Sequence, residues 1–274
     1  MRNSISNSTA RIAYGVTLAL LVSLAAPTGV HAQGRPGGPG GPMPSAEAAA
    51  PVDLTGYWES VVTYDWEQRM VTPRPGDHDG VPLRPAGIQI MDAWNPAKDT
   101  AMGLQCKSYG APTIMRVPEH LHITWRDDET LKMETDAGEQ TRLFHFVKSD
   151  AAPAGPRTWQ GYSAAEWQPQ RVGERGQPGS DQFRPGKTVW GNLQVTTTDL
   201  RAGYLRKNGI PYSEHAKLLE YYDLIQVVKG QSLMVVSSVV TDPVYLFIPF
   251  RTTSQFLKQP SDAGWERSAC SAMW

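Results

Sequence analysis

Histidine and arginine side chains recur at alternate positions in one stretch of the chain, a spacing that could place them on one face of a sheet. His120 and His122 flank a single apolar residue, as neighbours on one face of a strand do. If tight turns join three strands here, His122 lies opposite Met133, and Met133 lies opposite Arg142. Phe144 then shares this face. A slip of one residue in either turn would exchange the two faces of the sheet.

A face that combines imidazole, guanidinium and apolar side chains is typical of a barrel interior that holds a ligand. The same composition also fits the solvent-exposed outside of a sheet, and both interpretations stay open. The His-x-His spacing occurs in zinc and copper sites, but His145, which could be a third ligand, falls on the opposite face. The sequence contains no phosphate-binding glycine loop and no dinucleotide fingerprint, so we expect neither a metal nor a cofactor.

A second group of reactive side chains lies in Arg201–Glu220, a long connection between two expected strands. Tyr204, Arg206, Tyr212 and Glu214 could supply a proton donor, an anion-binding group and a base. Long polar loops at the rim of a barrel often carry binding groups. The alternative is a solvated loop with an Asn-Gly turn.

Strands must position these groups, and the sequence predicts an all-β meander. Apolar residues alternate with polar ones in short runs that are separated by turn residues. The expected strands are Gly56–Thr63, 118–125, Thr130–Asp136, Thr141–Lys148, Thr158–Trp167, Val189–Thr198, Lys217–Val228, Ser232–Thr241 and Phe247–Leu257. An antiparallel up-and-down barrel would close the edges of such a sheet, and a two-sheet β-sandwich is the alternative.

Two stretches interrupt the meander. Gly87–Met102 has weak helical character, which Pro96 interrupts. Gln168–Lys187 is rich in Gly, Pro and charged residues and indicates a mobile surface insert.

The overall composition excludes several classes of protein. The 274 residues carry a formal net charge of −1, which provides no electrostatic basis for binding nucleic acid. The 25 Gly and 22 Pro residues favour turns over long helices, and the hydrophobic share of 40% is sufficient for a folded core.

The N-terminal segment has the layout of a secretory signal peptide. Arg2 and Arg11 precede the uncharged apolar run Ile12–Ala26, and cleavage is expected after Ala32. A membrane anchor is the alternative, but this run is shorter than the about 20 residues of a spanning helix. We therefore expect a signal peptide over 1–32, a Gly/Pro-rich flexible linker over 33–51 and a single β-barrel domain over 52–274. The mature chain would be periplasmic or secreted, with no integral membrane segment.

Cys106 and Cys270 are the only cysteines of the chain. Because export places them in an oxidising compartment, we expect a disulfide between them. Closing so long a loop contributes about 4–5 kcal/mol in the chain-entropy model.

Four short segments resemble a family of uncharacterised secreted bacterial β-barrel proteins. They are Thr158–Ser163, Leu193–Thr197, Gly209–Glu214 and Thr241–Tyr245, and they occur in this order. The family's frame is a W-x-G-x-S strand, an L-x-V-x-T strand, a G-x-P-x-S-E loop and a strand that ends in D-P-x-Y. The resemblance implies an exported β-domain and assigns no activity.

The opening Leu54–Trp58 is similar to the Gly-x-Trp opening of lipocalin-type barrels. In those barrels the tryptophan plugs one end and packs under an arginine of a late strand. The resemblance implies a lipocalin-like barrel in which Arg251 is the partner of Trp58.

Two functions stay open. The first is binding of a small apolar or aromatic molecule; the candidate ligand-binding residues are His120, His122, Arg142, Phe144, Trp159, Tyr162, Tyr204, Arg206 and Tyr212. The second is a cofactor-independent lyase, isomerase or hydrolase at the barrel mouth, with His122, Arg142, Tyr212 and Glu214 as candidate catalytic residues.

Overall fold

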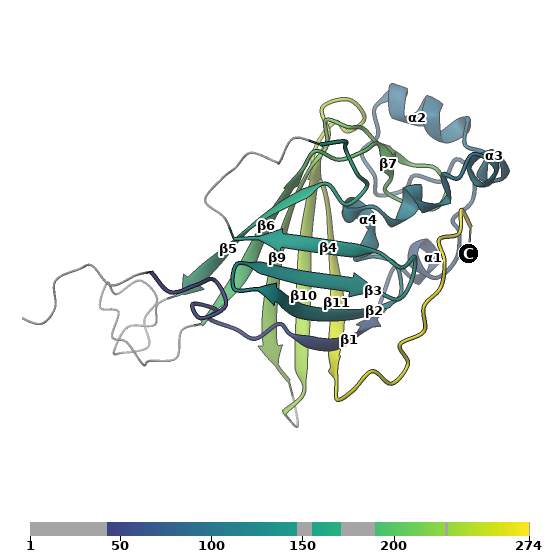
Figure 1. Ribbon diagram of the computed structural model, residues 1–274. Helices are drawn as coiled ribbons and strands as arrows, with labels where there is room; N and C mark the ends of the chain where they lie inside the picture. Colours follow the sequence, from purple (N-terminus) through teal and green to yellow (C-terminus); the bar gives the residue numbers. More distant parts are fainter. Residues whose placement is uncertain (1–42, 147–154, 171–189, 228–229, 274) are drawn as a thin grey trace, which may run out of the picture. The chain divides into compact units, whose positions relative to one another are not determined.

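Nine strands of the described chain close into a barrel. The computed structural model describes residues 43–146, 155–170, 190–227 and 230–273 (Figure 1). The barrel strands are β1 (Gly56–Val61), β2 (His120–Asp127), β3 (Thr130–Thr135), β4 (Thr141–His145), β5 (Tyr162–Gln170), β6 (Trp190–Thr198), β9 (Lys217–Gln226), β10 (Ser232–Thr241) and β11 (Phe250–Gln259). Their order around the barrel is β1-β11-β10-β9-β6-β5-β4-β3-β2. The expected barrel is confirmed, and the sandwich alternative is wrong.

One strand pair departs from the antiparallel order. β4 and β5 run parallel, while every other pair in the described barrel is antiparallel. The alternation of apolar residues predicted the strands but could not reveal their relative direction, since parallel and antiparallel strands alternate alike.

The expected register of the first hairpin is wrong by one residue. His122 pairs with Glu134, and Met133 pairs with Ile123, because the turn lies one residue later and a bulge follows Trp125. The second register is confirmed, since Met133 pairs with Arg142. As a result the histidines face outward, while Met133 and Arg142 are buried in the barrel.

Side chains fill the barrel interior. The largest fully buried ones include Trp58, Arg142, Tyr222, Phe144 and Phe256. The cation above the Trp58 ring belongs to Lys258, whose Nζ lies 5.4 Å from the ring centroid. Arg251, the expected partner, is exposed and pairs with Val239 instead.

Short helices cover one end of the barrel, which we call the closed end (Figure 1). They are α1 (Trp66–Arg69), α2 (Pro85–Asp92), α3 (Pro96–Ala101), the 3-10 helix η1 (Gln105–Tyr109) and α4 (Ala111–Ile114). Pro96 is the first residue of α3, as a helix start favours, and the Asn95 side chain accepts a hydrogen bond from Lys98 N. Ile114, Met115 and Val117 join the barrel core from this side.

The long connection after β6 is not a solvated loop. It contains the short hairpin of β7 (Gly203–Tyr204) and β8 (Pro211–Tyr212), and every residue from 203 to 213 is buried. Asn208 has 0% exposure and donates to the carbonyls of Arg74 and Asp77. Backbone carbonyls of a distant loop thus satisfy the Asn208 amide nitrogen, while its Oδ1 has no partner among the described residues.

The C-terminal strap, residues 260–273, runs along the outside of the barrel to the closed end (Figure 1). There Cys270 forms a disulfide with Cys106, as expected. On the way, Ser268 N donates to Asp136 O and Ser268 O accepts from Gly138 N.

The folded part begins earlier than the expected boundary at residue 52. Residues 43–274 form one unit, in which Ala46 is buried against the barrel. The expected signal peptide, the linker up to residue 42 and most of the insert over 168–187 lie outside the described residues. None of the helices in the described part of the chain has the length and apolar character that a membrane span requires.

Candidate functional site

The barrel wall has a seam where β4 meets β5. The described residues pair these strands at only two positions, Phe144 with Ser163 and His145 with Ala164. β5 continues to Gln170 with β6 as its partner on the other side. Beyond Ala164, the β4-facing edge of β5 therefore has no strand partner among the described residues, and side chains rather than backbone hydrogen bonds close the wall.

Three aromatic side chains, the aromatic trio, pack at this seam. Trp125 lies at the end of β2, Phe146 directly follows β4, and Trp167 belongs to β5. The ring centroids of Phe146 and Trp167 lie 5.2 Å apart, and those of Trp125 and Phe146 lie 5.5 Å apart. All three rings are half-buried and pack against the barrel core. The rings thus lie at the edge of the barrel core with part of their surface exposed.

A groove of about 990 Å³ runs along the seam and over the outer face of β5 and β6. Phe146, Trp167 and Met43 line its apolar end. Its further lining residues are Pro44, Ala46, Glu129, Tyr162, Ala164, Ala165, Glu166, Gln194, Thr196, Thr198 and Lys217. Half of the lining residues are apolar and half are polar or charged. The volume lies at the upper end of the about 300–1,000 Å³ common for ligand sites, so the groove has room for a small molecule.

The N-terminal residues of the folded unit form one wall of the groove. Trp167 Nε1 donates a hydrogen bond of 2.8 Å to the carbonyl of Ala46, and Ala46 N donates to Glu129 Oε1 at 3.3 Å. Glu47 N donates to the carbonyl of Asp128. These bonds fix Ala46 and Glu47 against both the β2–β3 turn and β5, so this wall of the groove is held in place.

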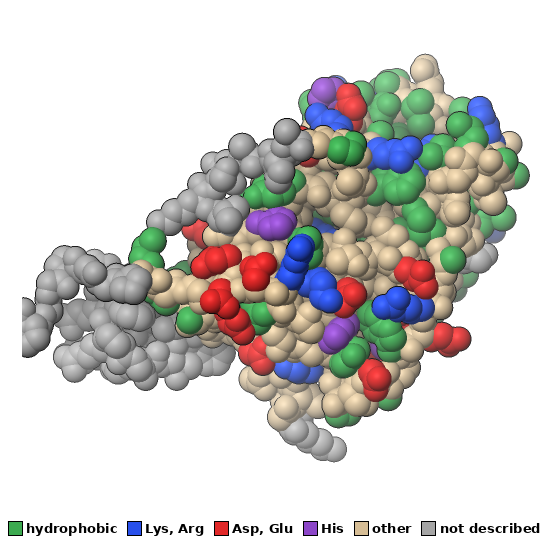
Figure 2. Space-filling model, in the orientation of Figure 1, with side chains coloured by type: hydrophobic (Ala, Val, Ile, Leu, Met, Phe, Trp, Pro, Cys, Tyr) green, Lys and Arg blue, Asp and Glu red, His purple; other side chains and the backbone are tan. Residues whose placement is uncertain are grey.

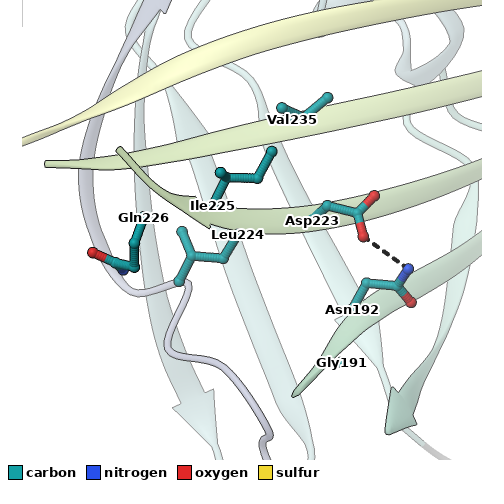
Figure 3. Close-up of a pocket in the computed structure, with 7 residues that line it drawn as sticks. All are labelled: Gly191, Asn192, Asp223, Leu224, Ile225, Gln226 and Val235. Carbon is teal, nitrogen blue, oxygen red and sulfur yellow. Dashed lines mark hydrogen bonds between the residues drawn. The ribbon is translucent and has the colours of Figure 1, made fainter. Parts of the chain in front are cut away.

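A smaller cavity of about 460 Å³ lies between β6, β9 and β10 (Figure 3). Asn192 Nδ2 donates to Asp223 Oδ1 at 2.9 Å across its floor, and Leu224 and Ile225 supply apolar surface. It has no aromatic lining residue among those described, so it offers a ligand less contact area than the groove does.

A buried ion pair occupies the barrel interior near the closed end. Arg142 donates to both carboxylate oxygens of Glu220, at 3.1 and 2.5 Å, and also to the Tyr222 hydroxyl and Thr197 Oγ1. Burial alone would lower the pKa of Arg142, but the Glu220 carboxylate outweighs burial and raises it. Thr197 Oγ1 shares a hydrogen bond with Ser163 Oγ. This network is enclosed in the barrel and reaches no groove residue.

Two further titratable groups are buried at the closed end. Glu119 is 5% exposed, and neither of its carboxylate oxygens has a hydrogen-bond partner among the described residues. Burial, reinforced by the Asp136 charge, raises the pKa of Glu119 well above its usual value. Burial lowers the pKa of Lys207 to about 7, and its Nζ donates to the Tyr109 hydroxyl at 2.6 Å.

The four candidate catalytic residues do not come together. His122 lies on the outer face, stacked on Tyr57 with 4.1 Å between the ring centroids. Arg142 is inside the barrel, Tyr212 is buried in a separate core at the closed end, and Glu214 is exposed beside Arg157.

Of the candidate ligand-binding residues, Tyr162 lines the groove. The others have different surroundings: His120 bonds to Asp136, Phe144 packs on Tyr222, Trp159 bonds to Ala202 O, Tyr204 bonds to Asp99 and Arg206 bonds to Asp79 O. Among the described residues, no three His, Cys, Asp or Glu side chains gather in a way that could hold a metal ion.

Sequence reasoning missed the aromatic trio. Trp125 and Trp167 end two expected strands and Phe146 lies within a third, so aromatic residues near strand ends were the available signal. The β2–β3–β4 meander brings Trp125 close to Phe146, and the parallel pairing of β4 with β5 adds Trp167.

No protein-family model, curated protein or solved structure matches the chain.

Proposed function

We propose that the protein is an exported binding protein that holds a small, largely apolar or aromatic molecule in the seam groove. The observation that carries the proposal is the packed pair of rings, Phe146 and Trp167, at the apolar end of a groove of about 990 Å³. A ligand that buries about 200 Å² of apolar surface there gains about 5 kcal/mol. After the cost of lost freedom, the expected dissociation constant is on the order of micromolar to millimolar.

The test is a titration with N-phenyl-1-naphthylamine, a neutral aromatic dye whose fluorescence rises in apolar surroundings. Phe146→Ala removes ring surface from the groove and should weaken binding about fivefold to tenfold. Phe247→Ala is the matched control, because Phe247 is 58% exposed beside Arg84 at the closed end. Equal affinities in the two variants, or no binding to the folded wild type, would contradict the proposal.

Export is supported by the Cys106–Cys270 disulfide, which is compatible with a compartment outside the cytoplasm. The full chain expressed in a bacterium should be recovered from the periplasm or medium with residues 1–32 removed, as intact mass would show. A full-length, reduced product in the cytoplasm would contradict export.

The alternative of a cofactor-independent lyase, isomerase or hydrolase remains a proposal without an assembled site. Its four candidate residues lie in different environments, and a base must reach the proton it removes. The groove therefore favours binding over catalysis.

A further inference from the structure

Carboxylates flank the apolar end of the seam groove. Glu129 projects from the β2–β3 turn and Glu166 from β5, and both line the groove and are exposed. Figure 2 shows acidic side chains gathered where the β2–β3 turn lies in Figure 1. Asp127, the last residue of β2, and Asp128 in the turn are also exposed.

Neighbouring cations do not neutralise these two groups. In the described part of the chain, no Lys or Arg forms an ion pair with Glu129 or Glu166, whereas Lys132 pairs with Glu134 on β3. Lys217 is the basic residue of the lining. It lies at the start of β9, next to the end of β6, rather than at the aromatic trio. Arg126 also lies near the turn, where it acts on Asp127 and His145. A ligand at the trio therefore lies beside two carboxylates that have no ion-pair partner in the described part of the chain.

Ring faces and carboxylates together are the chemistry that binds organic cations. An indole or phenyl face attracts a cation within about 6 Å of its centroid, and a nearby carboxylate adds a Coulomb attraction. An anionic ligand of the same shape would be repelled, and a neutral one would gain only the apolar contact.

We propose that the ligand of the seam groove is an organic cation, a flat apolar body that carries an amine or quaternary ammonium group. This inference rests on the proposed function and adds the charge of the ligand to it. The apolar body contacts Phe146 and Trp167, and the cationic group lies towards Glu129 and Glu166.

The test compares three probes with one aromatic body: (1-naphthylmethyl)trimethylammonium, the neutral 1-naphthalenemethanol and the anionic 1-naphthylacetate. Isothermal titration should give the cation at least about tenfold higher affinity than the neutral probe, and the anion the lowest. The preference should shrink between 20 mM and 500 mM NaCl, since salt screens exposed charges.

Glu129→Gln and Glu166→Gln should each lower the cation-to-neutral affinity ratio about twofold to fivefold, the range of an exposed ion pair. Both variants keep the shape of the side chain, and the amide that replaces the Glu129 carboxylate still offers an oxygen to Ala46 N. The matched control is Glu59→Gln, an exposed β1 residue that accepts from Gln259 Nε2 and lies outside the groove lining. It should leave the ratio unchanged.

The outcomes separate the two proposals. If the neutral probe binds as well as the cation, the charge inference is overturned and the proposed function stands. If none of the three probes binds to the folded protein, both are overturned.

Discussion

The Arg142–Glu220 pair shows how a buried charge is compensated inside this barrel. Both side chains have zero exposure, so neither charge is hydrated, and each depends on the other for compensation. The Tyr222 hydroxyl and Thr197 Oγ1 each accept one further hydrogen bond from the guanidinium group. Nε of Arg142 has no partner among the described residues. The pair therefore fixes how β4 and β9 face each other across the interior more than it adds stability.

Glu220→Gln should destabilise the protein by about 3–5 kcal/mol, because the Arg142 charge would stay buried without a counterion. The double variant Arg142→Met/Glu220→Met should recover most of that loss, since it removes both charges. Urea unfolding measures both values. A single variant within about 0.5 kcal/mol of the wild type, the range of ordinary surface changes, would contradict the buried pair.

The raised pKa of Glu119 predicts that the stability of the protein changes with pH in the opposite direction to that caused by a carboxylate in an ion pair. Its folded-state pKa is raised, by burial first and by Asp136 second, although Arg69 and Arg142 counteract this. Above the unfolded pKa of about 4.3, the folded state holds a proton that the unfolded state loses, so stability falls as pH rises. The slope reaches at most about 1.4 kcal/mol per pH unit.

Glu119→Gln should remove this loss, because glutamine does not ionise. The variant should therefore gain stability over the wild type as pH rises from 4.5 to 7.5. Urea midpoints across that range give the comparison. Parallel pH profiles for variant and wild type would show that Glu119 does not titrate there.

At the scale of elements, local sequence patterns located the strands, whereas long-range contacts determined their register, direction and pairing. Ser232–Thr241 is confirmed to the residue as β10, since it is a run rich in β-branched residues that follows a Lys-Gly-Gln turn sequence. The first hairpin slipped by one residue because a bulge carries no local signal. Of the candidate site, sequence reasoning supplied only Tyr162, because the groove depends on a strand pairing between residues far apart in the chain.

The buried connection 203–213 makes an element-scale prediction. Gly209 has φ of +84°, and a Cβ there would clash with Cβ and Cγ of Trp94. Gly209→Ala should cost about 1–3 kcal/mol for the clash, in addition to the backbone cost. Gly76→Ala is the matched control, since Gly76 has φ of +80° with no heavy atom within 4 Å. Equal losses in urea unfolding would show that Trp94 moves aside freely.

At the scale of the whole molecule, segments outside the barrel hold its two ends. The disulfide at Cys270 attaches the C-terminal strap to the closed end, and residues 43–47 attach to Trp167 and the β2–β3 turn. Ala46 and Glu47 should stabilise the seam, because they bond to Trp167 on β5 and to the β2–β3 turn where β4 and β5 pair at only two positions.

A truncation series tests this bridging. A chain that starts at Met43 is the reference, because the folded unit begins there. A chain that starts at Val52 should lose about 1–3 kcal/mol, since it lacks the bonds of Ala46 to Trp167 and Glu129. Trp167→Phe, which removes the indole donor, should cost about 1 kcal/mol in the Met43 chain and much less in the Val52 chain. Equal costs of Trp167→Phe in the two chains would mean that this hydrogen bond does not hold the N-terminal segment to the seam.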